Sequence, residues 1–236
     1  MIILLRGHIR NSFDTQYLYE LMQYLSNNYN IEIYIHTWDI IQNNISWREI
    51  KENNISVTNE MIYDYFKDLK HLIKHIIIDS DKDLKLFGNT KGYVYKAPCL
   101  GWKNMWYGKY RIIKYLLENS NSFKSKPFVD QLVVNLRFDI FSNSQIFEAI
   151  NIIKFINNIA YYTSLNNHLL RKNIFIKNIP TCYGIDNIYI GNINTMYKLI
   201  GHFHFNLDKI MLRYKYNRKI RVQEALVFLE NKRLFS

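Results

Sequence analysis

Short apolar runs alternate with amphipathic stretches along this chain, and the alternation predicts strands and helices in turn. The runs are a few residues long and are bounded by polar residues, which is typical of strands buried on both faces of a parallel sheet. Such strands are expected over Ile2–Leu5, Ile31–Ile35, His75–Ile78, Val133–Phe141, Asn173–Lys177 and Ile188–Ile190.

Apolar residues at helical spacing fill most of the remaining chain. Leu18, Leu21 and Leu25 would share one face of a helix that Asp14 and Thr15 can cap. Helices are expected over Tyr17–Tyr29, Thr58–Lys70, Trp102–Glu118, Ser144–Asn157, Asn194–Ile200, Leu207–Tyr214 and Val222–Lys232, and loops over Asn43–Asn54 and Gly88–Gly101. Strand and helix in alternation predict an α/β fold with right-handed crossovers: a single domain whose mostly parallel sheet is flanked by helices.

Composition changes this picture only by indicating the kind of partner. The 236 residues are enough for one well-buried domain, and 48% apolar residues with only 8 Gly and 3 Pro argue against disorder. The net charge of +11 indicates an anionic partner, which leaves nucleic acid, an acidic membrane surface or a phosphorylated small molecule open.

The cysteines, the first residues and the length of the apolar runs predict where in the cell the protein lies. Cys99 and Cys182 lack metal-binding spacing and are expected to be reduced thiols. The start of the chain does not read as a signal peptide, and no apolar run approaches the roughly 20 residues that span a bilayer. We expect a soluble cytoplasmic protein, with peripheral contact to the anionic inner membrane left open.

Charged residues stand at the carboxyl ends of two predicted strands. Arg137 and Asp139 lie two residues apart, so their side chains would leave an extended chain on the same side. Arg6 and Arg10 flank Gly7 after the first strand, and arginines suit a diphosphate because they make bidentate contacts to phosphate oxygens. Open α/β sheets bind ligands beyond this edge, although Arg6 and Arg10 as surface ion-pair formers remain an equal alternative.

Two further strand ends carry candidate chemistry. Asp39 would accept hydrogen bonds from ribose or a base and Trp38 would stack on the base, with a capping Asp and a core Trp as an equal alternative. The pair Asp79 and Asp81 has the spacing of a divalent-metal site, but the charge run around it favours a solvated turn.

Three other features are better explained by a structural role than by ligand binding. Trp102, Trp106 and Tyr110 form a stripe typical of a helix core, although Lys103 and Lys109 beside it would still approach an anion. His202 and His204 have no accompanying ligand cluster and are interpreted as structural. The basic tract Arg213–Arg221 is interpreted as a solvated helix end rather than as an RNA or lipid contact.

Four stretches resemble a loosely defined set of glycosyltransferase-like proteins encoded in bacterial surface-polysaccharide gene clusters and in large viruses. In order they are similar to that set's R-G-x-x-R opening, its I-H-T-W segment, its R-x-D strand end and its D-x-x-x-x-G strand. They are Leu5–Arg10, Ile33–Asp39, Leu136–Ile140 and Asp186–Gly191. Val222–Leu226 weakly resembles an acceptor-side P-E-x-x-L motif, with Gln223 in place of Pro.

The resemblance implies a GT-A-like, Rossmann-like nucleotide-sugar fold with a donor-binding part over about residues 1–142 and an acceptor part over about 143–236. In such folds a D-x-D ends the strand after the long mid-chain helix, and here Arg137 stands in place of the first Asp. A resident cation lessens the need for a metal at the leaving diphosphate, so Mn²⁺ or Mg²⁺ at Asp139 is left open.

The same resemblance supplies roles for named residues. Asp186 or Glu224 would be the catalytic base of an inverting transfer, whereas a retaining transfer would need no base. The expected donor-binding residues are Arg6, Gly7, Arg10, Thr37, Asp39, Lys103, Arg137 and Asp139.

The predicted activity is transfer of a sugar, or of a related phosphorylated group, from a nucleotide-activated donor to a surface polysaccharide or lipooligosaccharide. Its partners would be that donor and a glycan acceptor, and nucleic acid is not expected. Two alternatives stay open: a basic nucleic-acid-binding protein, and a catalytically inactive sugar-binding relative.

Overall fold

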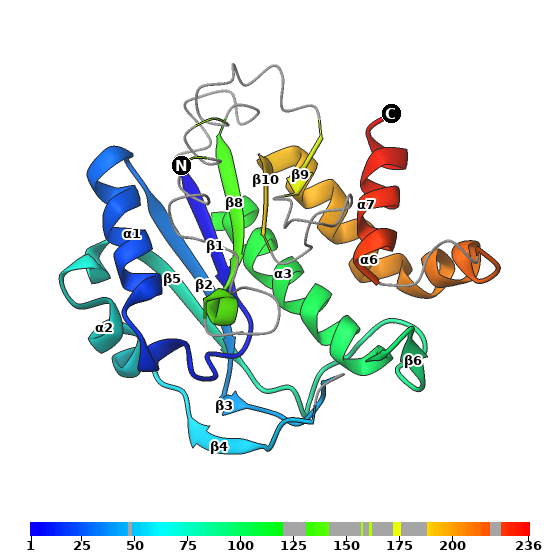
Figure 1. Ribbon diagram of the computed structural model, residues 1–236, viewed down its shortest axis with the longest axis horizontal. Coiled ribbons are helices and arrows are strands. Elements are labelled where there is room, and N and C mark those ends of the chain that lie inside the picture. The colour runs from blue at the N-terminus through cyan, green and yellow to red at the C-terminus, as the bar shows by residue number, and fades with distance from the viewer. Residues whose placement is uncertain are drawn as a thin grey trace.

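Six strands form the central sheet of the part of the chain that the structure describes (Figure 1). The computed structural model describes residues 1–46, 49–119, 131–141, 157, 161, 172–175, 188–217 and 223–236, and of residues 223 and 224 only the backbone. The sheet has the order β5-β2-β1-β8-β10-β9. Its strands are β1 (Ile2–Arg6), β2 (Glu32–Trp38), β5 (Ile73–Asp79), β8 (Leu132–Arg137), β9 (Ile174–Phe175) and β10 (Tyr189–Asn192).

Strand direction confirms the predicted fold class. The strands β5, β2, β1 and β8 are all parallel, while β10 runs antiparallel to both β8 and β9. Apolar residues on both faces of β1 explain why it lies inside the sheet: its five residues are all buried. The chain is therefore an α/β protein with a mostly parallel sheet, and its division into donor and acceptor parts stays a prediction.

Helices cover both faces of the sheet (Figure 1). Ile3 and Leu5 of β1 belong to the core beneath α1 (Tyr17–Asn28) and α2 (Asn59–Phe66). Ile2 and Leu4 belong to the core beneath the other layer, because successive side chains of a strand point to opposite faces. That layer consists of α3 (Cys99–Asn119), α6 (Ile193–Tyr214) and α7 (Gln223–Leu234). Within the described residues no helix is long and apolar enough to cross a membrane.

Several predicted boundaries were wrong. The strand predicted to end at Ile35 continues to Trp38, because His36, Thr37 and Trp38 are buried and pair with β5. The predicted loop Asn43–Asn54 ends two residues late, because β4 (Asn53–Ser56) already begins at Asn53. This strand pairs antiparallel with β3 (Ile40–Gln42), and the two form a hairpin. A two-residue pair, β6 (Tyr93–Val94) and β7 (Ala97–Pro98), lies in the second predicted loop, where α3 also begins.

The two helices predicted after residue 193 form one helix, α6. Its buried face runs unbroken through Ile200, Phe203 and Leu207, and this apolar stripe outweighs the helix-breaking tendency of the polar residues between them. Asn206 marks a kink, and its side-chain amide donates to the carbonyl of His202 at 3.2 Å. The helix predicted over Ser144–Asn157 lies almost wholly outside the described residues, with residue 157 alone described.

Helix caps and short 3₁₀ segments account for several of the connections between the described helices and strands. Thr58 caps α2, with its hydroxyl accepting from the amide of Met61 at 3.2 Å. Asp14 does not cap α1, because it lies in a separate 3₁₀ turn and the cap position is Gln16. The 3₁₀ segments are Ser12–Asp14, Lys67–Leu72 and Phe138–Ile140.

The helix α3 runs antiparallel to β5, which fixes where its beginning lies. Tyr107 donates to Asp79 at the end of β5 at 3.1 Å, whereas Tyr115 stacks on His75 near the start of β5, with ring centroids 3.6 Å apart. The first two turns of α3 therefore lie at the carboxyl edge of the sheet. Gly108 lets the helix approach closely there, because a Cβ at that position would lie 2.7 Å from Nδ1 of His36.

Alanine at two helical glycines should have opposite effects. Gly108→Ala is expected to lower the free energy of unfolding by about 1–2 kcal/mol, since the new methyl group overpacks the His36 ring. Gly201→Ala in α6 is the matched control, because nothing lies within 4 Å of its Cβ position, and it should raise stability by up to about 1 kcal/mol. Urea denaturation of both variants measures the difference; equal effects would contradict the close approach.

Candidate functional site

Four parallel strands end at one edge of the sheet, and β1, β8 and β5 end there in Arg6, Arg137 and Asp79. Arg6 at the end of β1 is in register with His36 of β2 on one side and with Arg137 of β8 on the other. Trp38 is in register with Asp79 of β5. Ligands of open α/β sheets bind outside this edge, which makes it the candidate site.

The loop after β1 turns back against β2 and β3. Gly7 has a φ of +97°, its amide donates to the carbonyl of His36 at 3.1 Å, and its carbonyl accepts from the hydroxyl of Thr37 at 3.0 Å. Arg10 also adopts a positive φ, +54°, and its amide donates to Ile41 at 3.0 Å. A left-handed arginine costs about 1–2 kcal/mol, and residues held in this way concentrate at functional sites.

Arg10 and Arg137 converge on one carboxylate. Nη1 of Arg10 lies 2.7 Å from Oδ2 of Asp139, and Nη2 of Arg137 donates to the same oxygen. Asp139 is only 3% exposed. Nε of Arg10 is buried without a protein partner, which leaves a donor ready for an external acceptor. Burial lowers the pKa of Arg10, an effect that Asp139 opposes, and arginine stays charged at neutral pH.

Arg6 adds a third guanidinium at the same edge. Its side chain is almost fully covered, and Nε donates to Oδ1 of Asn135 at 3.3 Å. Among the described side chains, Arg6, Arg10 and Arg137 bring three guanidiniums to this edge, and Asp139 brings one carboxylate. We call these four residues the arginine cluster. Guanidiniums at such an edge suit an anionic ligand, because they make bidentate contacts to phosphate oxygens.

The arginine cluster does not fit a divalent cation at Asp139. The Oδ2 oxygen that would ligate the metal already accepts from two guanidiniums, and Mg²⁺ or Mn²⁺ prefers several oxygen ligands without competing cations. Among the described side chains no group of three His, Cys, Asp or Glu residues could hold a metal.

A second polar network lies beside the cluster, at the end of β5. Oδ2 of Asp79 accepts from Arg111 at 3.0 Å and from Tyr107 at 3.1 Å, and lies 3.3 Å from Nε2 of His36. Burial alone would raise the pKa of Asp79, but the hydrogen bonds from His36 and Arg111 outweigh it and hold that pKa well below its ordinary range. The predicted solvated turn is therefore wrong for Asp79, which fixes the His36 ring.

Asn104 was not predicted from the sequence. It lies one turn before Gly108 on the same face of α3, and so at the carboxyl edge of the sheet. Asn104 is 5% exposed, and both its amide nitrogen and its amide oxygen are buried without a hydrogen-bond partner. A buried amide with both ends unpaired is costly, and a polar ligand would satisfy it. The signal in the sequence is an Asn four residues before a glycine and eight before Ile112, at the spacing of one helix face.

A cleft of about 400 Å³ opens beside Arg10. It lies between the loop after β1 and the β3–β4 hairpin, and its size suits a small ligand. Its walls combine polar and apolar side chains: Ile9, Arg10, Asn11, Phe13, Asp14, Ile41, Gln42, Asn53, Ile55 and Met61.

Other predicted donor-binding residues have structural contacts. Thr37 is fully buried and supports Gly7. Asp39 joins neighbouring segments through its backbone, with its amide donating to Asp79 at 3.0 Å and its carbonyl accepting from Val57 at 2.9 Å. Lys103 is not brought to the arginine cluster, because its ammonium pairs with Asp208 of α6 at 2.7 Å and donates to the carbonyl of Phe87.

The aromatic residues of this region are core residues. Trp38 is 4% exposed and stacks on Tyr107 with centroids 6.2 Å apart, so it packs inside the protein. Trp106 is fully buried and stacks on Phe203 of α6 at 4.3 Å, which confirms the core interpretation of the stripe. The ammonium of Lys109 lies 3.8 Å from the centroid of the Trp106 ring, a cation–π contact.

The two predicted catalytic bases cannot be placed. Asp186 lies outside the described residues, and Glu224 lies in α7 with its side chain outside them. Their roles stay predictions.

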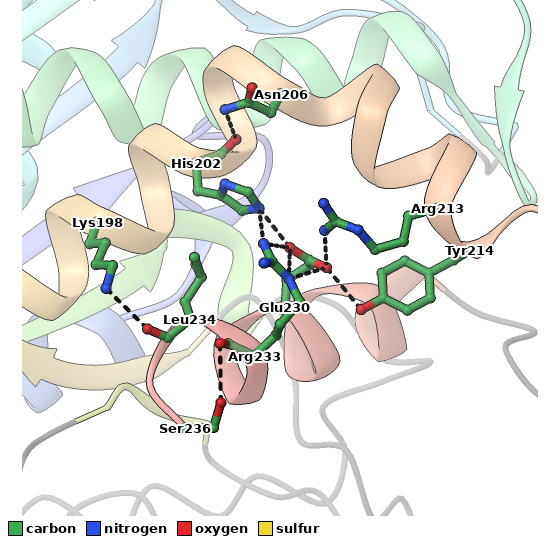
Figure 2. Close-up of polar contacts among 9 residues, drawn as sticks. All are labelled: Lys198, His202, Asn206, Arg213, Tyr214, Glu230, Arg233, Leu234 and Ser236. Carbon is green, nitrogen blue, oxygen red and sulfur yellow. Dashed lines mark hydrogen bonds and ion pairs between the residues drawn. The ribbon is translucent and has the colours of Figure 1, made fainter.

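A buried carboxylate joins α6 to α7 (Figure 2). Glu230 accepts from Arg213 at 2.7 Å, from Tyr214 at 2.8 Å and from Arg233 at 2.8 Å, and its Oε2 lies 2.6 Å from Nε2 of His202. Burial opposes the charge, but the hydrogen bonds from Arg233 and Arg213 outweigh it and lower the pKa of Glu230 to about 2. His202 and Arg213 thus have structural partners here.

No protein-family model matches the chain, and no curated protein matches it significantly. Among solved structures, galactosyltransferase LgtC in complex with donor and acceptor sugar analogs is similar over 100% of this chain and 70% of that one, with 9% identity and a TM-score of 0.39. An active-site mutant of LgtC gives the same values. Likeness at this level does not define a family.

Proposed function

We propose that this protein is a glycosyltransferase that moves a sugar, or a related phosphorylated group, from a nucleotide-activated donor to a surface polysaccharide or lipooligosaccharide. The observation that carries the proposal is the arginine cluster: three guanidiniums and one carboxylate at the carboxyl ends of two adjacent parallel strands. The sequence stretches that resemble glycosyltransferase-like proteins include these same residues.

The arginine cluster suits the chemistry of a departing diphosphate. When the bond from the sugar's anomeric carbon to the phosphate oxygen breaks, its electron pair stays on the phosphate and negative charge develops there. Donors already in place stabilise that charge without reorganisation. Arg10 contributes the unpaired Nε, and Asp139 orients Arg10 and Arg137 by holding one nitrogen of each.

The surroundings suggest where the rest of the donor lies. The cleft beside Arg10 would take the nucleoside, with the side-chain amides and the one carboxylate of its walls meeting the base and ribose. Asn104 would bind sugar hydroxyls, since its free amide offers both a donor and an acceptor. Neither assignment needs a metal, because the guanidiniums supply the positive charge.

The acceptor side of the reaction rests on residues predicted from the sequence. If the reaction inverts the anomeric centre, Asp186 or Glu224 would take the proton from the acceptor hydroxyl as it attacks. A retaining reaction would proceed without that base. The donor site proposed above serves either outcome.

Release of nucleoside diphosphate from a panel of nucleotide sugars tests the proposal. The full-length protein should release it from at least one donor, in EDTA as well as with Mn²⁺. Asp139→Asn should reduce the rate about 10–100-fold, because each charge-assisted hydrogen bond it weakens is worth about 1.5–3 kcal/mol. Asp83→Asn, which alters an exposed loop carboxylate, is the matched control and should leave the rate unchanged.

Three results would count against the proposal. Binding of a nucleotide sugar without release, in every acceptor condition, would favour an inactive sugar-binding relative. Full activity of Asp139→Asn would remove the arginine cluster from the reaction. Salt-sensitive binding of oligonucleotides, with no response to any nucleotide sugar, would favour a nucleic-acid-binding protein.

A further inference from the structure

The segment between β5 and α3 exposes large aromatic rings. Tyr93 is 70% exposed and Phe87 51% exposed, and Tyr95 is exposed as well. Phe205 of α6, 44% exposed, lies edge-on against Phe87 with ring centroids 4.9 Å apart. Several exposed large rings gathered on one segment and the neighbouring helix indicate a contact surface.

The same segment is basic. Residues 82–96 contain four exposed lysines, and Asp83 is the one exposed carboxylate among them. The lysines are Lys82, Lys85, Lys91 and Lys96. We call these lysines, together with Phe87, Tyr93, Tyr95 and Phe205, the aromatic–basic surface.

This surface is held in place from beneath. Oδ2 of Asp208 in α6 accepts from the amide of Asn89 at 2.8 Å, and Oδ1 pairs with Lys103 of α3 at 2.7 Å. Gly88 is required at the contact, because its φ is +70° and a Cβ there would lie 1.9 Å from Asp208. Cys99 closes the loop by donating its amide to the carbonyl of Gly92 at 2.8 Å. These contacts hold in place the segment that carries Phe87, Tyr93 and Tyr95.

The aromatic–basic surface lies at the rim of the molecule. In Figure 1 the β6 segment is at the side where α6 passes, across the sheet from α2. The segment leaves the sheet at Asp79, the carboxyl end of β5, and so lies on the same edge as the arginine cluster.

We propose that the aromatic–basic surface docks the protein on an anionic lipid bilayer. Tyrosine rings favour the bilayer interface, phenylalanine rings bury apolar area among the acyl chains, and lysines are attracted to acidic headgroups. An anionic bilayer would contact the aromatic rings and the lysines together, because its interface accepts the rings and its negative headgroups attract the lysines. The basic tract Arg213–Arg221 is a weaker candidate, because Arg213 is already bound to Glu230.

Co-sedimentation of the full-length protein with vesicles tests this proposal, and it is independent of sugar-transfer activity. The protein should sediment with vesicles of phosphatidylcholine mixed with phosphatidylglycerol and remain in solution with phosphatidylcholine alone. Lys91→Glu combined with Lys96→Glu should weaken binding at least about 25-fold, since each lysine near such a surface is worth about fivefold. Phe87→Ser combined with Tyr93→Ser should weaken it as well.

Matched controls lie away from the aromatic–basic surface, near the start of β5 and on α1. Lys70→Glu combined with Lys74→Glu changes the same net charge on exposed residues near the start of β5, and Tyr24→Ser removes an exposed ring from α1. Both controls should bind anionic vesicles like the natural protein. The proposal is overturned if the natural protein does not bind anionic vesicles, if the control and surface variants lose equal affinity, or if the surface binds RNA and not vesicles.

Discussion

Alanine in place of Arg137 is expected to lower the turnover number for the best nucleotide-sugar donor about 10²–10³-fold. That is the usual effect of removing one preorganised donor from charge that develops in a transition state. The fold should survive, because Asp139 keeps its 2.7 Å contact with Arg10 and is not left as an unpaired buried charge. Steady-state kinetics with the purified variant, alongside its urea denaturation curve, measure both effects.

Lysine at the same position separates charge from geometry. Arg137→Lys keeps the positive charge but loses the planar fork that contacts Asp139 and would contact the phosphate of a bound donor, so it should restore only part of the lost rate. Lys70→Ala, on an exposed residue of the 3₁₀ segment before β5, should match the natural protein. A turnover number for Arg137→Ala within about threefold of the natural value would show that this guanidinium does not act on the leaving group.

Replacing Glu230 by glutamine should lower the free energy of unfolding at neutral pH by about 2–3 kcal/mol. Loss of one partner from a buried ion pair costs about 3–5 kcal/mol, and the figure is reduced here because Arg213 and Arg233 are partly exposed and can be solvated. Urea denaturation measures the change. Glu118→Gln, which alters an exposed i,i+4 pair with Lys114, should change stability by less than about 0.5 kcal/mol.

The same substitution should change the response of stability to acid. The pKa of Glu230 falls from 4.5 to about 2 on folding, so its stabilising contribution is complete above pH 4.5 and is lost as the pH falls towards 2. Over that interval the natural protein should lose more stability than Glu230→Gln, and the two curves should converge. Parallel curves from pH 7 to pH 2 would show that the carboxylate in Figure 2 does not ionise at the lowered pKa.

The fold class was predictable from the local pattern of apolar and polar residues. Several of the wrong predictions concern strand boundaries that depend on pairing with distant strands. The apolar runs of β1 and β8 predict buried strands because both faces of the sheet are covered. The extension of β2 through His36 was missed, because a histidine and a threonine read as loop residues until β5 pairs with them. The short pairs β3–β4 and β6–β7 have no apolar alternation and leave little signal.

Some residues of the candidate site were predictable from the sequence, and others depend on tertiary packing. Arg6, Arg10 and Arg137 were predictable, since residues at the carboxyl ends of parallel strands must share an edge. The roles of Asn104 and Lys103 were not, because they depend on how α3 is rotated over the sheet. Lys103 faces Asp208 of α6, whereas Asn104 lies on the stripe that approaches His36 through Gly108. One residue along a helix turns the side chain by about 100°.

Calorimetric titration with nucleoside diphosphates tests the central claim, that guanidiniums at the sheet edge hold the donor's diphosphate. We predict that one of UDP, GDP, ADP, CDP and dTDP binds the natural protein in EDTA, and that Arg10→Ala and Arg137→Ala each weaken its binding about tenfold or more. Lys70→Ala should bind like the natural protein. Binding that requires Mn²⁺, or that is unchanged in both arginine variants, would contradict the claim.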